Sequence, residues 1–500
     1  MPDRPSDRRA RVTAADTYDV VIVGAGPAGI FAALSLKDSG LAVCLLEKGP
    51  ALEHRTCPMQ SREAGCARCT PCALLCGWGG AGAYSDGKLT LTPAIGGKLQ
   101  DYVGQKALGR LIEEVDRTYL HFGAPETVFA PDERVFRDLQ RRAATADLIL
   151  VRSRVRHLGT ERCREVLRRM REELEGRVTV MTRTEAVEIL VEPREGAPAK
   201  RRVAGVRLAD GTAVRARYLI CGPGREGAGW LVGEIRRLGL GLTNNPVDIG
   251  VRVELPAVVM EDFTDHLYEP KLIYYSKTFD DQVRTFCMNP YGQVVAENSD
   301  GLLTVNGHSY ATRKTELTNF ALLVSKTFTE PFREPIAYGR SIAGLANMLG
   351  DGVIVQRLGD LQAGRRSTPK RLAKSVVQPT LEQAVPGDLS LVLPYRHLRS
   401  ILEMLEAMDR VMPGVNSRHT LLYGVEVKFY SSRPELTPNL ETKIANFFAV
   451  GDGAGVTRGL VQASASGLLV AREILKREGL AREQTASGGP SSPGRFMPSR

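Results

Sequence analysis

Three glycines near the N-terminus have the spacing of a phosphate-binding turn. Gly24, Gly26 and Gly29 form a G-x-G-x-x-G pattern between the apolar segment DVVIV and a segment rich in Ala and Leu. In such a turn the first glycine permits the tight bend, the second lets the backbone approach a pyrophosphate, and the third lets helix and strand pack closely. Glu47 ends the next apolar segment, 18 residues after Gly29, where its carboxylate could accept hydrogen bonds from a ribose. The pattern predicts dinucleotide binding.

A second G-x-G-x-x-G pattern follows the apolar segment ARYLIC, at residues 222–227. It could be a second dinucleotide site, one for NAD(P)H. However, Pro223 removes an amide that a phosphate cradle would use, and no apolar segment ending in an acid follows at the expected distance. We therefore interpret Gly222 as part of a turn that ends a strand beneath the first dinucleotide, with NAD(P)H binding as the open alternative.

A run of cysteines offers metal or redox chemistry. Its spacing is C-x2-C-x2-C-x3-C, and its members are Cys66, Cys69, Cys72 and Cys76. This is the spacing of a bacterial iron–sulfur run, but Gly77 stands where such runs have proline, and there is no second run. A [4Fe-4S] cluster, a tetrahedral zinc ion and free thiols all remain compatible with it, and Cys57 is a fifth thiol nearby. An iron–sulfur centre here would favour a ferredoxin-like electron partner over NADPH.

The composition narrows the class of protein. The chain has 500 residues, 43% of them hydrophobic, which is enough for a large core and for two or more domains. Its net charge is +10, but Lys and Arg are scattered and no basic run is interleaved with aromatic residues, so nucleic-acid binding is not expected. The sequence shows neither a secretory signal nor an apolar stretch of membrane-spanning length. Nine cysteines without an export signal suggest reduced thiols, and we expect a cytoplasmic protein.

The elements around these motifs are expected to be as follows. Residues 18–49 predict a strand, a helix and a second strand, and residues 160–174 predict a helix from their apolar spacing. Residues 178–222 are strand-like, and Asp210-Gly211 between two apolar runs is a hairpin signal. Near the C-terminus, residues 446–477 predict a buried strand, a glycine turn and a closing helix.

The last of these segments contains Ala449-Val450-Gly451-Asp452, which resembles the second flavin motif of the glutathione-reductase-like flavoproteins. Nearly all of residues 18–477 is similar to a family of uncharacterised FAD-dependent dehydrogenases related to those flavoproteins. The segments that carry the resemblance are GWGGAGAYSDGKL (77–89), RHLGT (156–160), NNPVDIGVRVELP (244–256), RTFCMNPYGQVV (284–295), VNGHSY (305–310), QRLGDLQAGRRST (356–368), YGVEVKFYS (423–431) and VGDGAGVTRGLVQASASG (450–467). The resemblance implies FAD as cofactor, with Asp452 at its ribityl chain and Gly451 and Gln462 beside it. It implies no particular substrate.

These patterns and the resemblance together predict an α/β fold with α+β elements, in which a mixed α+β substrate domain interrupts a Rossmann-like FAD-binding domain. We expect residues 18–100, 140–230 and 421–477 to form the FAD-binding domain, residues 101–139 a connecting helical segment and residues 231–420 the substrate domain. Residues 1–17 are expected to be a disordered basic arm, and residues 478–500 a disordered tail.

The chemistry of a flavoprotein resides in the flavin, so the protein must supply positioning and proton transfer. Gly79 and Gly80 belong to a loop of small residues that permits close approach to the cofactor. His308, Asp86 and Lys428 are the candidate catalytic residues, because each is a titratable group within a segment that carries the resemblance.

We therefore predict an FAD-dependent oxidoreductase that transfers a hydride between its flavin and a small substrate, one that is anionic or carbonyl-conjugated. Two other functions are compatible with the sequence. One is an FAD-containing enzyme linked to tRNA, which the positive charge would serve. The other is a flavin protein that relays electrons to another enzyme.

Overall fold

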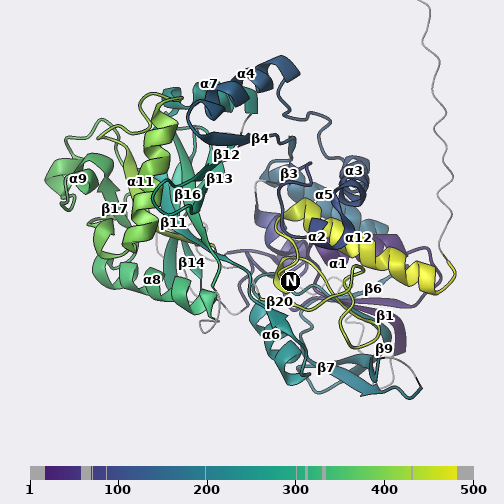
Figure 1. Ribbon diagram of the computed structural model, residues 1–500. Coiled ribbons are helices and arrows are strands. Elements are labelled where there is room, and N and C mark those ends of the chain that lie inside the picture. Colours follow the sequence, from purple (N-terminus) through teal and green to yellow (C-terminus); the bar gives the residue numbers. More distant parts are fainter. Residues whose placement is uncertain are drawn as a thin grey trace, which may run out of the picture.

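The computed structural model describes residues 17–57, 69, 71–85, 87–196, 199–267, 269–299, 301–309, 314–328, 334–428 and 432–480. These residues form two lobes, each built on one large sheet with its own hydrophobic core (Figure 1). No helix within these ranges has the length and apolar character that crossing a membrane requires.

The first sheet contains the expected βαβ unit. Its strand order is β6-β2-β1-β9-β8-β7, and β21 also pairs with β9. Strands β6, β2, β1, β9 and β21 are parallel to one another, whereas β7, β8 and β9 form an antiparallel ribbon that turns at Asp210 and Gly211, as predicted. The bounds are β1 (Thr17–Val23), β2 (Val43–Leu46), β6 (Thr179–Met181), β7 (Ala186–Pro193), β8 (Arg201–Leu208), β9 (Ala213–Cys221) and β21 (Phe447–Ala449). The predicted Rossmann-like arrangement is confirmed.

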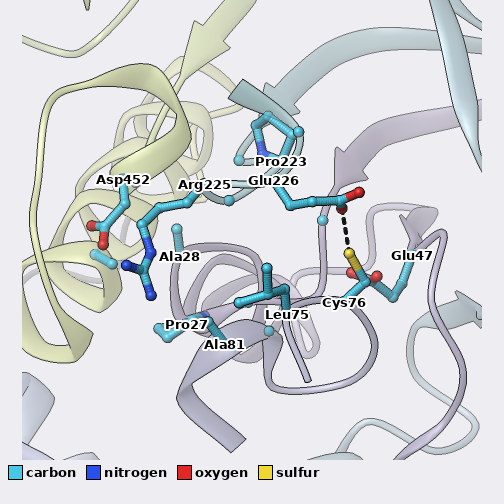
Figure 2. Close-up of a pocket in the computed structure, with 18 of the residues that line it drawn as sticks. Pro27, Ala28, Glu47, Leu75, Cys76, Ala81, Pro223, Arg225, Glu226 and Asp452 are labelled. Carbon is cyan, nitrogen blue, oxygen red and sulfur yellow. Dashed lines mark hydrogen bonds between the residues drawn. The ribbon is translucent and has the colours of Figure 1, made fainter. Parts of the chain in front are cut away.

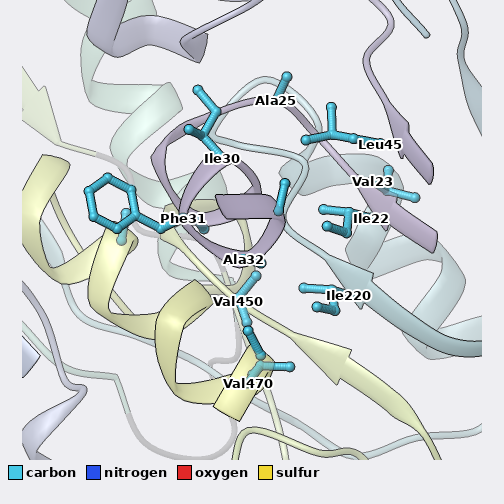
Figure 3. Packing of buried hydrophobic residues seen from close by; sticks show 14 of the residues in the cluster. Ile22, Val23, Ala25, Ile30, Phe31, Ala32, Leu45, Ile220, Val450 and Val470 are labelled. Atoms are coloured by element: carbon cyan, nitrogen blue, oxygen red, sulfur yellow. The ribbon is translucent and has the colours of Figure 1, made fainter. Parts of the chain in front are cut away.

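Helices from both ends of the chain cover this sheet. Its helices are α1 (Pro27–Leu36), α2 (Gln100–Val103), α3 (Gln105–His121), α5 (Thr160–Glu173), α6 (Ala228–Arg237) and α12 (Leu460–Arg477). Figure 3 shows the core, where Ile22 of β1, Phe31 of α1 and Val470 of α12 lie in one cluster. Helices α1 and α12 approach closely because Gly467 has no side chain: a Cβ there would lie 1.9 Å from the carbonyl oxygen of Ala28.

The second sheet is antiparallel except at one edge. Its strand order is β18-β17-β19-β11-β16-β13-β12-β4, and only β17 and β18 pair in parallel. The bounds are β4 (Leu148–Val151), β11 (Val247–Pro256), β12 (Lys271–Tyr275), β13 (Gln282–Asn289), β16 (Leu317–Lys326), β17 (Ile354–Arg357), β18 (Val385–Pro386) and β19 (Leu421–Lys428).

The remaining elements surround this second sheet or join the two lobes. The helices of the second lobe are α4 (Glu133–Ala144), α7 (Glu261–Leu267), α8 (Pro335–Gly350), α9 (Leu358–Gln362), α10 (Pro369–Leu372) and α11 (Tyr395–Asp409). Three short strand pairs complete the fold: β14 (Gln293–Ser299) with β15 (Leu302–His308), β3 (Lys88–Thr90) with β5 (Val155–His157), and β10 (Leu242–Thr243) with β20 (Arg433–Pro434).

Strand β11 shows why the second sheet has two different faces. Its odd-numbered residues from Val247 to Leu255 are apolar and belong to the core that α11 covers. Its even-numbered residues include Asp248, Arg252 and Glu254, which are also buried but lie on the opposite face, because successive side chains of a strand alternate. This second face is therefore polar and buried at the same time.

Two of the expected domain boundaries differ from the sheets that form. Strand β19, residues 421–428, pairs with β11 and β17 and so belongs to the second sheet rather than to the first. Strand β4, expected within the FAD-binding part, pairs with β12 in the second sheet, and α4 packs into the same core. Both differences arise from pairing between segments far apart in the chain, which local sequence patterns do not report.

The contact between α1 and α12 yields a prediction for stability. Gly467→Ala should destabilise the protein by about 1–3 kcal/mol, because the new methyl group overlaps the Ala28 carbonyl and the two helices must separate. Gly233→Ala in α6 is the matched control, since a Cβ there meets no atom within 4 Å and alanine favours a helix. Urea denaturation of both variants measures the difference, and equal unfolding midpoints would contradict the predicted overlap.

Candidate active site

A cleft opens at the carboxyl ends of the parallel strands of the first sheet, which is where α/β sheets commonly bind ligands. Its volume is about 310 Å³, within the range of small-molecule pockets. Most of its lining comes from the turn between β1 and α1, the loop from Leu75 to Lys88, the turn at residues 222–227 and the segment from Gly451 to Ala463 (Figure 2). Residues 46–48, residues 184–186 and Trp230 complete it.

The glycines of the first turn have the geometry that the sequence predicted. Gly24 has φ +99°, and a Cβ on it would lie 2.2 Å from the carbonyl oxygen of Gly222. A Cβ on Gly29 would lie 1.9 Å from the carbonyl oxygen of Gly24. A Cβ on Gly26, in contrast, would meet no atom within 4 Å, and Gly26 lines the cleft. The first and third glycines therefore allow close packing, while the second leaves room for a ligand.

Glu47 connects three backbone segments at one end of the cleft. Its carboxylate is buried and accepts three backbone N–H groups, from Ala25 at 2.8 Å, Gly49 at 2.8 Å and Gly77 at 2.9 Å. It thus joins the glycine turn, the end of β2 and the loop that precedes Trp78. Glu47 also lines the cleft, so contact with a ribose, as the sequence suggested, stays a prediction.

The turn at residues 222–227 belongs to this same cleft. Gly222, Pro223 and Gly224 line it, and Gly24 packs directly against Gly222. Its two charged side chains point in opposite directions: Arg225 lies toward Asp452, whereas Glu226 reaches Lys48 at 2.5 Å and accepts a hydrogen bond from the thiol of Cys76 (Figure 2). This placement supports the interpretation of the turn as part of the first dinucleotide site.

The opposite end of the cleft is formed by small residues and Asp452. Gly80, Ala81 and Gly82 line it together with Gly451 and Asp452. Burial raises the pKa of Asp452, although hydrogen bonds from Gly459 N at 3.1 Å and Thr457 Oγ1 at 2.8 Å offset part of that effect.

A buried arginine forms hydrogen bonds with the backbone of the loop of small residues. The guanidinium of Arg55 is inaccessible to solvent and donates to four backbone carbonyls, those of Ala73 and Leu74 at 2.9 Å, Trp78 at 2.6 Å and Gly80 at 2.8 Å. Burial lowers its pKa. Because buried charges are costly unless fully hydrogen-bonded, this arrangement holds the loop in one shape. No local sequence pattern points to Arg55.

Other predicted residues occupy different places. Gly79 and Gln462 do not line the cleft; the Gln462 amide donates to the carbonyls of Ile95 at 3.0 Å and Pro93 at 3.4 Å, so it supports that loop. Asp86 lies outside the described residues.

His308 and Lys428 both lie close to Glu297, an acid that the sequence analysis did not single out. Lys428 Nζ is 3.9 Å from Glu297 Oε2 and 3.1 Å from Glu426 Oε1. Burial raises the pKa of Glu297, but the charges of Lys428, Arg225 and His308 together with a hydrogen bond from Asn306 hold that pKa below its usual value. Two of the three candidate catalytic residues therefore surround one ionised carboxylate.

Lys428 also contacts Glu426, which belongs to a buried ion pair on the polar face of the second sheet. Arg252 and Glu426 are both fully buried and joined by two contacts, at 2.8 and 2.9 Å. Arg252 also donates to Asn319 Oδ1 at 2.8 Å and to the Cys287 carbonyl at 3.1 Å. Such a pair persists only when its remaining hydrogen bonds are made. Its signal in the sequence was the alternation of apolar and charged residues along β11.

The polar face and the cleft meet at Phe286. Lys88, which lines the cleft, donates to the carbonyl of Met288 at 3.3 Å. Arg458, from the segment that follows Asp452, lies 6.0 Å from the centre of the Phe286 ring, as does Lys428. Lys88 and Arg458 therefore connect the Asp452 side of the first lobe with the polar side of the second sheet.

Comparisons with known proteins agree with this arrangement. Residues 19–57 match the family model described as FAD binding domain, and residues 246–429 match the model described as FAD-dependent protein, C-terminal domain-like. The cofactor is FAD. The first match covers β1, α1 and β2, and the second covers most of the second sheet, including β19.

Individual proteins resemble the chain more distantly. An uncharacterized protein of Clostridium beijerinckii is 26% identical over 480 residues, which cover 91% of this chain and 80% of that protein. Glycine oxidase from Geobacillus kaustophilus is 13% identical with a TM-score of 0.37, covering 97% of this chain and 100% of the oxidase. L-proline dehydrogenase from P. horikoshii is 11% identical with a TM-score of 0.39, covering 92% and 94%. Similarity this low says nothing about the substrate.

The structure places part of the cysteine run at the Glu47 end of the cleft. Cys76 is buried and lines the cleft, Cys72 is partly buried, Cys69 is exposed, and Cys66 lies outside the described residues. Among the residues that the structure does describe, no three ligating side chains are grouped as a metal ion would need. The iron–sulfur cluster therefore stays a prediction.

The surroundings of Cys76 predict its reactivity. Burial and the hydrogen bond to Glu226 raise the pKa of its thiol, so at pH 8 it should remain protonated and resist alkylation by iodoacetamide while Cys69 reacts. Glu226→Gln leaves the Lys48 ammonium beside Cys76 without its carboxylate, which should lower that pKa and speed the reaction. Peptide mapping by mass spectrometry follows both sites. Equal alkylation of Cys76 and Cys69 in the unmodified protein would contradict this account.

Proposed function

We propose that this protein is an FAD-dependent oxidoreductase acting on a small anion, such as a carboxylate, that binds beside Phe286 between the cleft and the polar face of the second sheet. The observation that carries the proposal is the charge around this place. Among the described residues, four cations gather here with three carboxylates: Lys88, Arg252, Lys428 and Arg458 with Glu297, Glu426 and Asp452. The cations of this group would attract an anionic substrate and stabilise it there.

Two further cations near Phe286 are paired with carboxylates of their own. Arg284 lies 4.9 Å and Lys271 5.3 Å from the centre of the ring. Arg284 is paired with Asp248, and Lys271 with Glu269. The positive charge toward the cleft therefore comes from the first group, which includes residues of both lobes.

Lys428 is the residue best placed to hold the substrate or a proton. Its side chain is only 11% exposed, and Glu426 fixes its ammonium group at 3.1 Å. Bound FAD supplies two-electron transfer, so the protein must take or give the proton that accompanies it. Lys428 and His308 are the groups beside Glu297 that can do so, and His308 is exposed toward solvent, from which it could exchange protons.

The position of the turn at residues 222–227 in the first cleft supports one further part of the proposal. The turn at residues 222–227 then serves the same FAD as the first glycine turn, and electrons enter from a partner rather than from a second bound dinucleotide. Anaerobic mixing with NADPH and with a reduced ferredoxin would compare the two donors directly. Rapid reduction of the flavin by NADPH alone would contradict the absence of a nicotinamide site.

The substrate proposal is tested by reduction of the flavin under anaerobic conditions with a panel of small hydroxy and amino carboxylates and their neutral amides. We expect carboxylates to reduce it and amides to fail. Lys428→Met should raise KM by about tenfold or more through loss of a charge-assisted hydrogen bond, and Lys428→Arg should restore part of the affinity. Lys443→Met is the control, because Lys443 is 72% exposed and pairs with Glu435 away from the cleft.

Two results would contradict an anionic substrate, and a third would indicate an electron relay. Amides that are oxidised as fast as their carboxylates, or a Lys428→Met variant with unchanged KM, would contradict an anionic substrate at this place. A protein whose flavin no small molecule reduces, yet which exchanges electrons with another protein, would be an electron relay instead.

A further inference from the structure

Arg225 stands out among the charged residues of the cleft because of where it points. It belongs to the turn at residues 222–227 and extends across the cleft from Glu226, toward Asp452 and past the start of α1 at Pro27 and Ala28 (Figure 2). Its charge lowers the pKa of Asp452 and of Glu297, although burial raises both. The guanidinium therefore lies within electrostatic reach of both lobes.

The glycine turn alone offers few donors to a pyrophosphate. The N–H of Gly24 is bonded to the Leu46 carbonyl at 2.8 Å, and the N–H of Ala25 to Glu47 at 2.8 Å. Pro27, the first residue of α1, has no N–H, and neither has Pro223 opposite it. The amides of Gly26, Ala28 and Gly29 remain at the helix start. These three amides would face a pyrophosphate, which carries two negative charges.

A cation is needed to complete this site, and one is present. The cations that line the cleft are Lys48, Lys88 and Arg225. Lys48 is paired with Glu226 at 2.5 Å, and Lys88 donates to the Met288 carbonyl at 3.3 Å. Within the part of the chain that the structure describes, Arg225 makes no hydrogen bond or ion pair, so its five N–H groups are available to a ligand.

We propose that Arg225 binds the pyrophosphate of FAD and supplies the charge that the glycine turn lacks. The planar guanidinium suits two phosphate oxygens at once, which a lysine cannot match. The turn at residues 222–227 thus contributes to phosphate binding through a side chain, where its pattern had suggested a backbone cradle. This inference rests on FAD as cofactor and concerns how the protein holds it.

Titration of the deflavinated full-length protein by calorimetry tests the proposal. Arg225→Met should weaken FAD about ten- to hundredfold, since a hydrogen bond to a charged group is lost, and Arg225→Lys should recover part of the loss. ADP-ribose, which carries the same pyrophosphate, should lose as much as FAD, while riboflavin, which carries none, should bind unchanged. Arg236→Met is the matched control, because that side chain is 64% exposed on the adjoining helix α6.

Two other results of this titration would overturn the proposal. If Arg225→Met binds FAD and ADP-ribose within twofold of the unmodified protein, Arg225 does not contact the pyrophosphate, and a raised KM for substrate in that variant would assign it to the substrate instead. If riboflavin weakens equally, the variant has altered the cleft in general. Should Arg225→Met not fold, the lysine variant and the salt dependence of FAD binding give the same comparison. Failure of the unmodified protein to bind any flavin would contradict the cofactor itself.

Discussion

The carboxylate of Glu47 is the group on which the cofactor cleft depends. It accepts three backbone N–H groups, from Ala25, Gly49 and Gly77, and these belong to three separate segments. A buried carboxylate needs such partners, and each charge-assisted bond contributes on the order of 1.5–3 kcal/mol. One side chain therefore sets the shape of the glycine turn and the position of the loop that Arg55 braces, and the rest of the cleft is built against these two.

Close backbone contact is the second constraint, and it joins the two ends of the chain. The turn after β1 packs on the turn after β9 through Gly24 and Gly222, and α12 packs on α1 through Gly467. Strand β21 enters the first sheet beside β9 and delivers Asp452 to the cleft. The residues between these ends fold as the second sheet, and Lys88 and Arg458 connect its polar face with the Asp452 side of the cleft.

The sequence predicted those features that depend on local patterns. The glycine spacing determines a turn within a few residues, so Gly24, Gly26 and Gly29 and their different roles could be read from it. Strand pairing is not local: nothing near residues 148–151 indicates that β4 pairs with β12, and nothing near residue 421 indicates that β19 belongs with β11. Sequence reasoning missed Arg55, Glu297 and Arg225 as site residues for the same reason. The contacts that place each of them in the site come from distant segments of the chain.

Binding of FAD in the cleft is the property on which all the other conclusions depend. The decisive measurement is the amount and identity of the flavin bound by the unmodified protein and by Gly26→Ala, determined from the visible absorbance of the native proteins and by mass spectrometry after denaturation. Gly26 has φ −79° and an empty space in front of its Cα, so alanine is compatible with the fold and should only obstruct the ligand. We predict one FAD per chain in the unmodified protein and in Gly233→Ala, and little in Gly26→Ala at unchanged thermal stability of the flavin-free protein. Unmodified protein that takes up no FAD, or a Gly26→Ala variant that binds it equally well, would contradict the central claim.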